Sequence, residues 1–160
     1  MKRTSEPAAR RPRFPKGYGI PESADGLLSW SWAEERLEGW RNYWLATTNP
    51  DGAPHAMPVW GLWLEGAFVF STSPESRKGR NLARDVRATV HVESDDDVVI
   101  VEGQVERIAL DDRLADLYEE KYEYRPSPNS PDEAWYRLKP RLAYAWDRDY
   151  PRTATRFVFD

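Results

Sequence analysis

The sequence predicts a mainly β fold, a β-barrel with flanking helices, and two observations lead to this prediction. Short runs of β-prone residues follow one another and are separated by tight turn signals, of which Asn49-Pro50-Asp51-Gly52 is the strongest. Few helical segments lie between these runs, whereas a doubly wound parallel sheet needs a helix after almost every strand. The chain has 160 residues, of which 40% are hydrophobic, so it is long enough for one domain with a substantial core.

The composition argues against several classes of function. The chain contains no cysteine, which excludes disulfides, thiolate zinc sites and cysteine nucleophiles and fits a cytoplasmic protein. The net charge is only -4, which argues against binding to nucleic acid through overall charge. No run approaches the ~20 apolar residues of a membrane span, and no apolar stretch follows the N-terminal charges as in a secretory signal. We therefore expect a cytoplasmic protein without a nucleic-acid or membrane partner.

Two regions are expected along the chain, a flexible basic tail over 1–26 and one folded domain over 27–160. The tail is rich in proline and glycine and shows little apolar periodicity. Its cations are Lys2, Arg3, Arg10, Arg11, Arg13 and Lys16.

The elements that follow the tail are consistent with a barrel. Ser31 with Glu34 three residues later forms a capping-box pattern, which predicts a helix over 31–41. Pro58 and Gly61 lie inside a β-prone run and predict an irregular strand: an edge, a bulge, or a place where a ligand approaches the backbone. The first strands are expected over 43–48, 55–64 and 67–72.

The later elements are predicted from the same signals. A helix is expected from Ser73 to about Arg84. The remaining expectations are a strand over 88–93, an acidic turn over 94–97, a strand over 98–108 with Gly103 as a bulge, a helix over 111–122, a loop over 125–131, a short helix over 132–138, and strands over 142–146 and 153–159.

Residues 70–82 carry the most informative chemistry. Three hydroxyl residues end a strand, and Ser76, Arg77 and Lys78 then begin a helix. Helix N-termini favour anions because their first N–H groups lack intrahelical acceptors and the helix dipole adds partial positive charge. A hydroxyl, a guanidinium and an ammonium group suit a phosphate. From the residues alone, a phosphate site and an ordinary amphipathic helix with solvated cations are equally compatible with this pattern.

Other residues give weaker signals. His55 and His91 are the only histidines, and no carboxylate or second histidine stands at metal-ligand spacing, so no metal site is expected. Tyr118, Tyr122 and Tyr124 precede the proline-rich loop and are candidates for the roof of a pocket, for a dimer interface, or for plain packing.

The motifs of the central segment resemble those of one family. Ser71-Thr72, followed by Ser76-Arg77-Lys78 and Asn81-Leu82, is similar to the cofactor-phosphate motif of pyridoxamine 5′-phosphate oxidases and their relatives. The strand over 54–60 and the strand over 101–107 match the order of elements in that family. The resemblance covers roughly 40–108 and implies the FMN-binding split β-barrel fold, with a homodimer that holds cofactor at its interface.

The resemblance also implies which residues contact the cofactor. The segment along the flavin or deazaflavin ring corresponds to Met57, Pro58, Val59, Trp60 and Gly61. The residues next to the phosphate or ribityl chain correspond to Ser71 and Thr72, the phosphate clamp to Ser76, Arg77 and Lys78, and a position one turn further to Asn81.

Two departures from the family pattern bear on the cofactor. Met57 stands where pyridoxamine-phosphate oxidases have an arginine, and Val98 stands near the position of a glutamine. The Pro58-Val59-Trp60 sequence resembles the branch that uses the deazaflavin coenzyme F420, so F420 is slightly favoured over FMN. The family's C-terminal substrate motif is not recognisable, so the substrate is an unidentified small molecule.

The resulting hypothesis is a flavin- or deazaflavin-dependent oxidoreductase that transfers hydride to or from a small molecule. No catalytic side chain is nominated, because the cofactor itself carries the chemistry in such enzymes. One alternative is a carrier or sensor that binds a flavin, a deazaflavin or haem without turnover. Another is a nucleic-acid-binding barrel that uses the basic tail, against which the acidic body argues.

Overall fold

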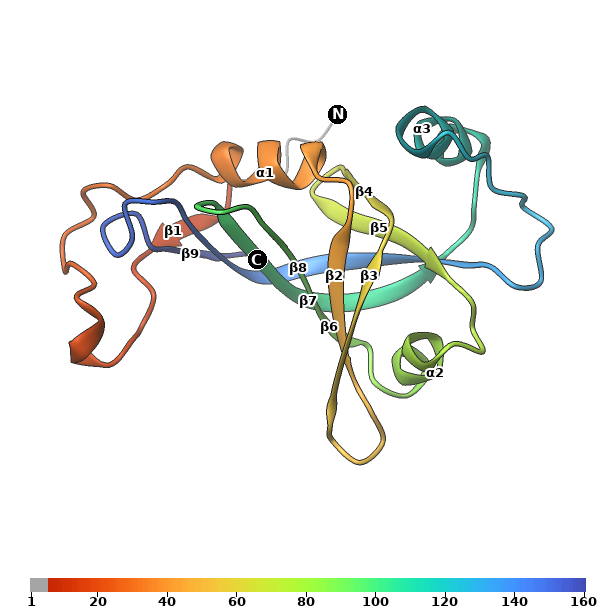
Figure 1. Ribbon diagram of the computed structural model, residues 1–160, viewed down its shortest axis with the longest axis horizontal. Coiled ribbons are helices and arrows are strands. Elements are labelled where there is room, and N and C mark those ends of the chain that lie inside the picture. Colours follow the sequence, from red (N-terminus) through yellow and green to blue (C-terminus); the bar gives the residue numbers. More distant parts are fainter. Residues whose placement is uncertain (1–5) are drawn as a thin grey trace.

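Antiparallel pairing joins nine strands into one curled sheet within residues 6–160, the part of the chain that the computed structural model describes. Three α-helices flank this sheet (Figure 1), so the predicted mainly β fold is confirmed. None of the helices in this part is long and apolar enough to cross a membrane. The strands are β1 (Ala8–Arg10), β2 (Tyr43–Thr48), β3 (Pro54–Val59), β4 (Gly61–Leu64), β5 (Ala67–Thr72), β6 (Arg87–Glu93), β7 (Val98–Ile108), β8 (Ala134–Trp146) and β9 (Thr155–Val158). The helices are α1 (Trp30–Gly39), α2 (Arg77–Arg84) and α3 (Asp112–Tyr122), with a 3-10 turn at Lys16–Tyr18.

The sheet branches at β8, which is long enough to serve two sets of partners. Its 13 residues pair with β7 over most of their length, while β5 pairs with its first part and β9 with its last part. The strand order is β1-β9-β8-β7-β6-β2-β3, and β4 joins the sheet through β5. β3 and β4 follow each other in the chain without pairing, so among the described strands β3 has one free edge.

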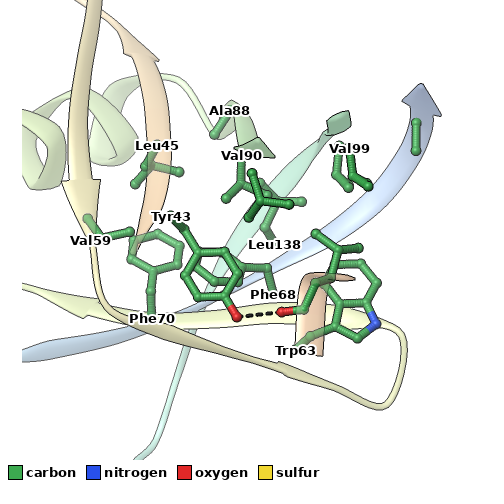
Figure 2. Close-up of a cluster of buried hydrophobic side chains, with 14 of the residues drawn as sticks. Tyr43, Leu45, Val59, Trp63, Phe68, Phe70, Ala88, Val90, Val99 and Leu138 are labelled. Atoms are coloured by element: carbon green, nitrogen blue, oxygen red, sulfur yellow. Dashed lines mark hydrogen bonds between the residues drawn. The ribbon is translucent and has the colours of Figure 1, made fainter. Parts of the chain in front are cut away.

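Alternate side chains of the strands fill the inside of the curled sheet. β6, for example, alternates between exposed and buried positions, and Val90 is fully buried. Figure 2 shows Tyr43 of β2 beside the aromatic residues Phe68 and Phe70 of β5 and the aliphatic residues of β6 and β7. The Tyr43 and Phe68 ring centroids lie 4.5 Å apart. This period-two alternation is what the β-prone runs of the sequence predict.

A second apolar cluster lies between β5 and α3. Phe68 and Phe70 belong to the main core, whereas Val69 belongs to the cluster under α3, so both faces of β5 are buried. The buried members of this cluster are Leu62, Val69, Leu114, Tyr118, Tyr122 and Trp135. Successive residues of β5 therefore point into two different environments.

The short helix expected over 132–138 is wrong, because Ala134 to Leu138 form the start of the long strand β8. Ala134 to Leu138 pair with β5 on one side, and Trp135 to Leu138 pair with β7 on the other. The hydrogen-bonding partners are more than 25 residues away in the sequence, so no local pattern reveals them. A register shift does occur beside Gly103, where a bulge was predicted, but the extra residue is Arg141 of β8, since Glu102 pairs with Leu142 and Gly103 with Pro140.

Two helices begin at other residues than predicted, α1 one residue earlier and α2 four residues later. α1 begins at Trp30, because the Ser29 hydroxyl accepts a hydrogen bond from the Trp32 N–H and thereby caps the helix in place of Ser31. α2 begins after the predicted Ser73 start, because Ser76 serves as its N-cap. In both cases several serines stand close together, and only the backbone path selects the one that caps.

The strand expected over 55–64 is irregular, as predicted. β3 ends at Val59 and β4 begins at Gly61, with Trp60 between them. Pro58 lies in β3, the edge strand, where a missing N–H costs least.

Part of the segment expected to be a flexible tail is held against the domain. Ala8–Arg10 form β1 and pair with β9. The Arg11 guanidinium donates hydrogen bonds to four backbone carbonyls, those of Ser23, Asp25, Arg152 and Ala154. Five bonds per guanidinium are the maximum, so this side chain is almost fully used in tying the segment to the C-terminal region. The cations Lys2 and Arg3 lie outside the described residues.

Candidate functional site

The predicted phosphate clamp lies at the start of α2, where the Ser76 hydroxyl already has hydrogen-bond partners within the protein. Its hydroxyl donates to the Ser73 carbonyl at 2.7 Å and accepts from the Gly79 N–H at 3.1 Å. It also lies 3.0 Å from the hydroxyl oxygen of Thr72. Because a hydroxyl has one proton, Thr72 is then the donor in this last bond. An anion at this helix end would therefore meet the N–H groups and the cations of the first turn rather than a free Ser76 proton.

Arg77 and Lys78 supply two positive charges at this helix end. Within residues 6–160 neither side chain forms an ion pair. Arg77 is exposed, whereas Lys78 is half-buried, and burial lowers the pKa of its ammonium group. A half-buried cation without a counter-charge is unfavourable on its own and is relieved by an anion. This environment fits a bound phosphate.

The backbone at the start of α2 leaves no space for a side chain at Gly79. A Cβ there would lie 2.3 Å from the Ser73 carbonyl oxygen and 2.8 Å from that of Pro74. The first turn of the helix is thus packed directly on the 73–74 backbone. The position of the clamp is fixed by this contact.

Asn81 has a structural role that the sequence does not reveal. Its side chain is 2% exposed, and its amide donates to the Thr47 hydroxyl at 3.0 Å and to the Asn49 side-chain oxygen at 3.1 Å. These bonds tie α2 to the end of β2 and its turn. The predicted contact between Asn81 and the cofactor stays a prediction, but both donors of its amide are already used within the protein.

Ser71 and Thr72 were expected to line one site, but their side chains face opposite sides of β5. Thr72 points toward Ser76 and the clamp. Ser71 is paired across the sheet with Trp135 and lies on the α3 side. There burial raises the pKa of Tyr118, and the Ser71 hydroxyl acts in the opposite direction. Only Thr72 is therefore brought to the clamp through its side chain.

The predicted ring segment runs along the exposed edge of the sheet. Met57 and Pro58 are exposed, while Val59 turns into the core. Trp60 is 41% exposed, and its ring stacks on that of Tyr122 with centroids 4.7 Å apart and planes at 11°. The segment thus offers a free strand edge and one partly exposed aromatic face.

The clamp and the ring segment lie toward opposite ends of β3. Asn81 ties α2 to the turn that precedes β3, whereas Trp60 follows its last residue. A strand rises ~3.3 Å per residue, so the six residues of β3 span ~20 Å. Figure 1 shows the corresponding arrangement, with α2 below β5 and α3 above it.

The C-terminal end of α3 also belongs to this site, and sequence reasoning found only part of it. The polar groups of Gly61 contact Tyr122, one of the candidates for the pocket roof, and Lys121, which no sequence pattern singles out. Arg41 also lies near the Trp60 and Tyr122 rings. No local signal marks Lys121 or Arg41, because the contact depends on how α3 docks on the sheet.

A separate groove of about 490 Å³ lies on the outer face of the sheet. None of the predicted contact residues lines it. Its lining includes Thr48 of β2, Arg87 of β6, Gln104 of β7 and Arg141 of β8. Within residues 6–160, no group of three or more His, Asp or Glu side chains is placed to hold a metal ion.

Comparisons with known proteins agree with this architecture. The family model described as pyridoxamine 5′-phosphate oxidase matches residues 33–147. The conserved hypothetical protein Rv2991 from Mycobacterium tuberculosis is 25% identical with a TM-score of 0.68, over 79% of this chain and 89% of that protein. An F420 reductase is 23% identical with a TM-score of 0.59, over 69% of this chain and 94% of that one. A haem-binding protein from Mycobacterium smegmatis is 28% identical with a TM-score of 0.55, over 72% of this chain and 52% of that one.

The likeness to these structures confirms the split β-barrel fold. The family model spans more than half of the chain and includes β2 to β8, α2 and α3. The chain therefore belongs to the pyridoxamine 5′-phosphate oxidase family.

Proposed function

We propose that the chain is a cytoplasmic oxidoreductase that binds a phosphorylated flavin-type cofactor, F420 or FMN, along the free edge of β3. The single observation that carries this proposal is Lys78, whose half-buried ammonium has a pKa lowered by burial and no acidic partner within residues 6–160. The family membership supports the cofactor class. The substrate is a small molecule that exchanges hydride with the cofactor.

The chain's own residues fit the two ends of such a cofactor. Arg77 and Lys78 would hold the phosphate, with the N–H groups of the first turn of α2. At the other end of β3, the Met57–Val59 edge and the Trp60 indole would receive the planar ring. When bound, the ring supplies the hydride chemistry, and the protein supplies position and electrostatics.

F420 is favoured over FMN by the sequence of β3. Met57 supplies no positive charge at the place where the sequence pattern of FMN-dependent relatives has an arginine. The preference thus rests on the β3 sequence.

The test is a titration of cofactor-stripped protein with F420 and with FMN, followed by quenching of cofactor and tryptophan fluorescence. The Arg77→Ala/Lys78→Ala double variant is expected to bind the cofactor more weakly by about 2–4 kcal/mol, because each charged hydrogen bond contributes about 1.5–3 kcal/mol with incomplete additivity. Arg80→Ala is the matched control, because Arg80 is an exposed cation on the same helix.

Each outcome of this titration has a distinct meaning. Wild-type affinity in the folded double variant would rule out the clamp. Tight binding of FMN with weak binding of F420 would reverse the proposed preference. Binding of neither cofactor would refute the oxidoreductase proposal.

A carrier or sensor without turnover is the second candidate. The similarity to a haem-binding protein at 28% identity favours it, although the chain matches only 52% of that protein. Titration with haem in the same assay separates the two. A Soret band shift with no binding of F420 or FMN would support the carrier.

We also propose that two copies pair through the outer face of the sheet. A row of paired residues crosses this face from β2 to β9: Trp44, His91, Ile100, Tyr144 and Arg156. Trp44 is 42% exposed, and its ring stacks on that of His91. Exposed aromatic side chains such as Trp44, together with arginine, are typical of protein interfaces. Such pairing would cover the outer groove and bring the second copy close to the exposed β3 edge.

A further inference from the structure

The end of α3 holds both polar backbone groups of Gly61, the first residue of β4. The Gly61 N–H donates to the Tyr122 hydroxyl oxygen at 2.9 Å. The Gly61 carbonyl oxygen lies 2.8 Å from that hydroxyl and 3.1 Å from the Lys121 ammonium, which donates to it. The Tyr122 hydroxyl also lies 2.8 Å from the Arg41 carbonyl, and its single proton serves one of the two carbonyls at a time. The polar backbone groups of Gly61 are thus bonded to α3, while β4 pairs with β5, where Gly61 lies opposite Phe70.

Lys121 connects this junction to α1 and β2. Its ammonium donates to the Tyr43 hydroxyl at 2.7 Å and to the Glu38 carbonyl at 3.3 Å, besides its bond to Gly61. The Tyr43 hydroxyl in turn donates to the Leu37 carbonyl, the bond dashed in Figure 2. The three N–H groups of the ammonium therefore serve three acceptors, one each on α1, β2 and β4. A side chain used in this way fixes the relative position of those elements.

The same contacts orient the Trp60 side chain. One face of its indole is covered by the Tyr122 ring. The Arg41 guanidinium carbon lies 5.7 Å from the Trp60 centroid and 5.2 Å from that of Tyr122. Because the two rings are only 4.7 Å apart, comparable distances to both place the guanidinium at their edges. The other face of the indole is left free of Arg41, in keeping with its 41% exposure.

Gly61 is also packed tightly against β5, on the side away from these hydrogen bonds. A Cβ at this position would lie 2.4 Å from the Phe68 ring and 2.8 Å from the Val69 carbonyl oxygen. The junction is thus clamped between β5 below and α3 above. Its shape follows from tertiary contacts on both sides.

We propose that Lys121 and Tyr122 are positioning residues, which set the shape of the β3–β4 junction and hold Trp60 in the orientation that receives the cofactor ring. This inference rests on the proposed function, because it concerns the ring end of the same site. It assigns the end of α3 to ring binding, whereas α2 is assigned to the phosphate. The two assignments predict different effects on binding affinity. Changes at the end of α3 should weaken binding of cofactors with and without a phosphate, whereas changes at α2 should weaken only the phosphorylated ones.

The test compares Tyr122→Phe with Tyr124→Phe, a control that removes the hydroxyl of an exposed tyrosine two residues away. Lys121→Met is compared with Glu120→Gln, an exposed neighbour on α3. Amide hydrogen exchange is measured at Gly61 and, as an internal reference, at the buried strand residue Leu45. Affinity is measured for FMN and F420 and for riboflavin and deazariboflavin, which lack the phosphate.

Tyr122→Phe is expected to speed exchange of the Gly61 amide about tenfold relative to Leu45, because this N–H loses its acceptor. Both Tyr122→Phe and Lys121→Met are expected to weaken binding of the phosphorylated and the phosphate-free cofactors by a similar factor of about ten. The Arg77→Ala/Lys78→Ala variant should weaken only the phosphorylated ones. The controls should match the wild type in both measurements.

The failures of the two proposals are distinguishable. If wild-type protein binds the cofactors and Tyr122→Phe binds them with unchanged affinity and an unchanged absorbance spectrum, the positioning role is refuted while the proposed function stands. If wild-type protein binds none of them, the proposed function fails and the positioning role fails with it. Unchanged Gly61 exchange in Tyr122→Phe would also overturn the inference, since the bond would then have no effect on the junction.

Discussion

At the scale of single residues, the site depends on three glycines that each touch another backbone. Gly61 lies against β5, Gly79 against the 73–74 backbone, and Gly103 against Lys139 of β8, where a Cβ would lie 2.1 Å from the carbonyl oxygen. All three lack the positive φ that favours glycine, so close approach alone explains them. Because glycine has no side chain, the backbone at each of these positions can pack in direct contact with the adjacent strand or loop.

Gly61→Ala is expected to lower the free energy of unfolding by about 1–3 kcal/mol, because the added methyl overlaps the Phe68 ring and the Val69 carbonyl. Urea unfolding followed by circular dichroism measures the change. Gly39→Ala is the matched control, since a Cβ at the end of α1 meets nothing within 4 Å. Equal stabilities of the two variants would contradict the close packing at Gly61.

At the scale of elements, the end of α3 carries an unusual lysine. Burial, with a smaller contribution from Arg41, lowers the pKa of Lys121 to about 8. The other groups that face it are the hydroxyls of Tyr43 and Tyr122, and burial raises the pKa of both, so they stay protonated as Lys121 titrates. Glu38 is exposed and accepts from Lys121 through its backbone carbonyl rather than through its carboxylate. Lys121 is thus the group in this network that changes charge near neutral pH.

The stability of the protein should consequently rise with pH between about 8 and 10.5 through Lys121. In this range the folded chain has released the proton while the unfolded chain, with the ordinary pKa of 10.5, still holds it, so the free energy of unfolding increases with pH. The contribution is isolated as the difference between wild type and Lys121→Met in urea unfolding at pH 7.5, 8.5 and 9.5. A difference that stays constant over these pH values would show that Lys121 keeps its ordinary pKa.

At the scale of the whole molecule, two surfaces extend the barrel beyond a single curled sheet. The N-terminal segment adds β1 to the edge of β9 and is tied there by Arg11. The outer face carries the aromatic row that begins at Trp44. The first surface is already covered within the chain, because β1 pairs with β9 and Arg11 donates hydrogen bonds to the nearby backbone carbonyls. The second exposes apolar area, which a partner copy would bury.

Trp44→Glu is expected to convert a dimer into a monomer, because a charge at the β2 end of this row would have to be buried without a partner. Sedimentation equilibrium at about micromolar concentrations gives the mass directly. Tyr18→Glu serves as the control, since Tyr18 is exposed in the N-terminal segment, away from the row. A monomeric wild-type protein, or a dimeric Trp44→Glu variant, would refute pairing through this face.

The sequence predicted most strands because their signals are local. β2, β5 and β7 have the predicted bounds, since β-prone residues end at turn residues or at a helix cap in each case. The start of β8 was mistaken for a helix, because its partners β5 and β7 are distant in the chain. The serine that caps a helix was also misassigned where two serines lie within one turn, as with Ser29 and Ser31.

By itself, the sequence determined the fold family and the irregularity at Pro58 and Gly61, because motif spacing and turn chemistry are properties of neighbouring residues. Only the tertiary structure decided that Ser71 and Thr72 serve different faces of β5, since the direction of a strand's side chains depends on what packs on each face. It also decided that Lys121 and Tyr122 hold Gly61, about 60 residues away in the chain. Contacts of that sequence separation arise from the docking of α3 on the sheet, and no local pattern encodes them.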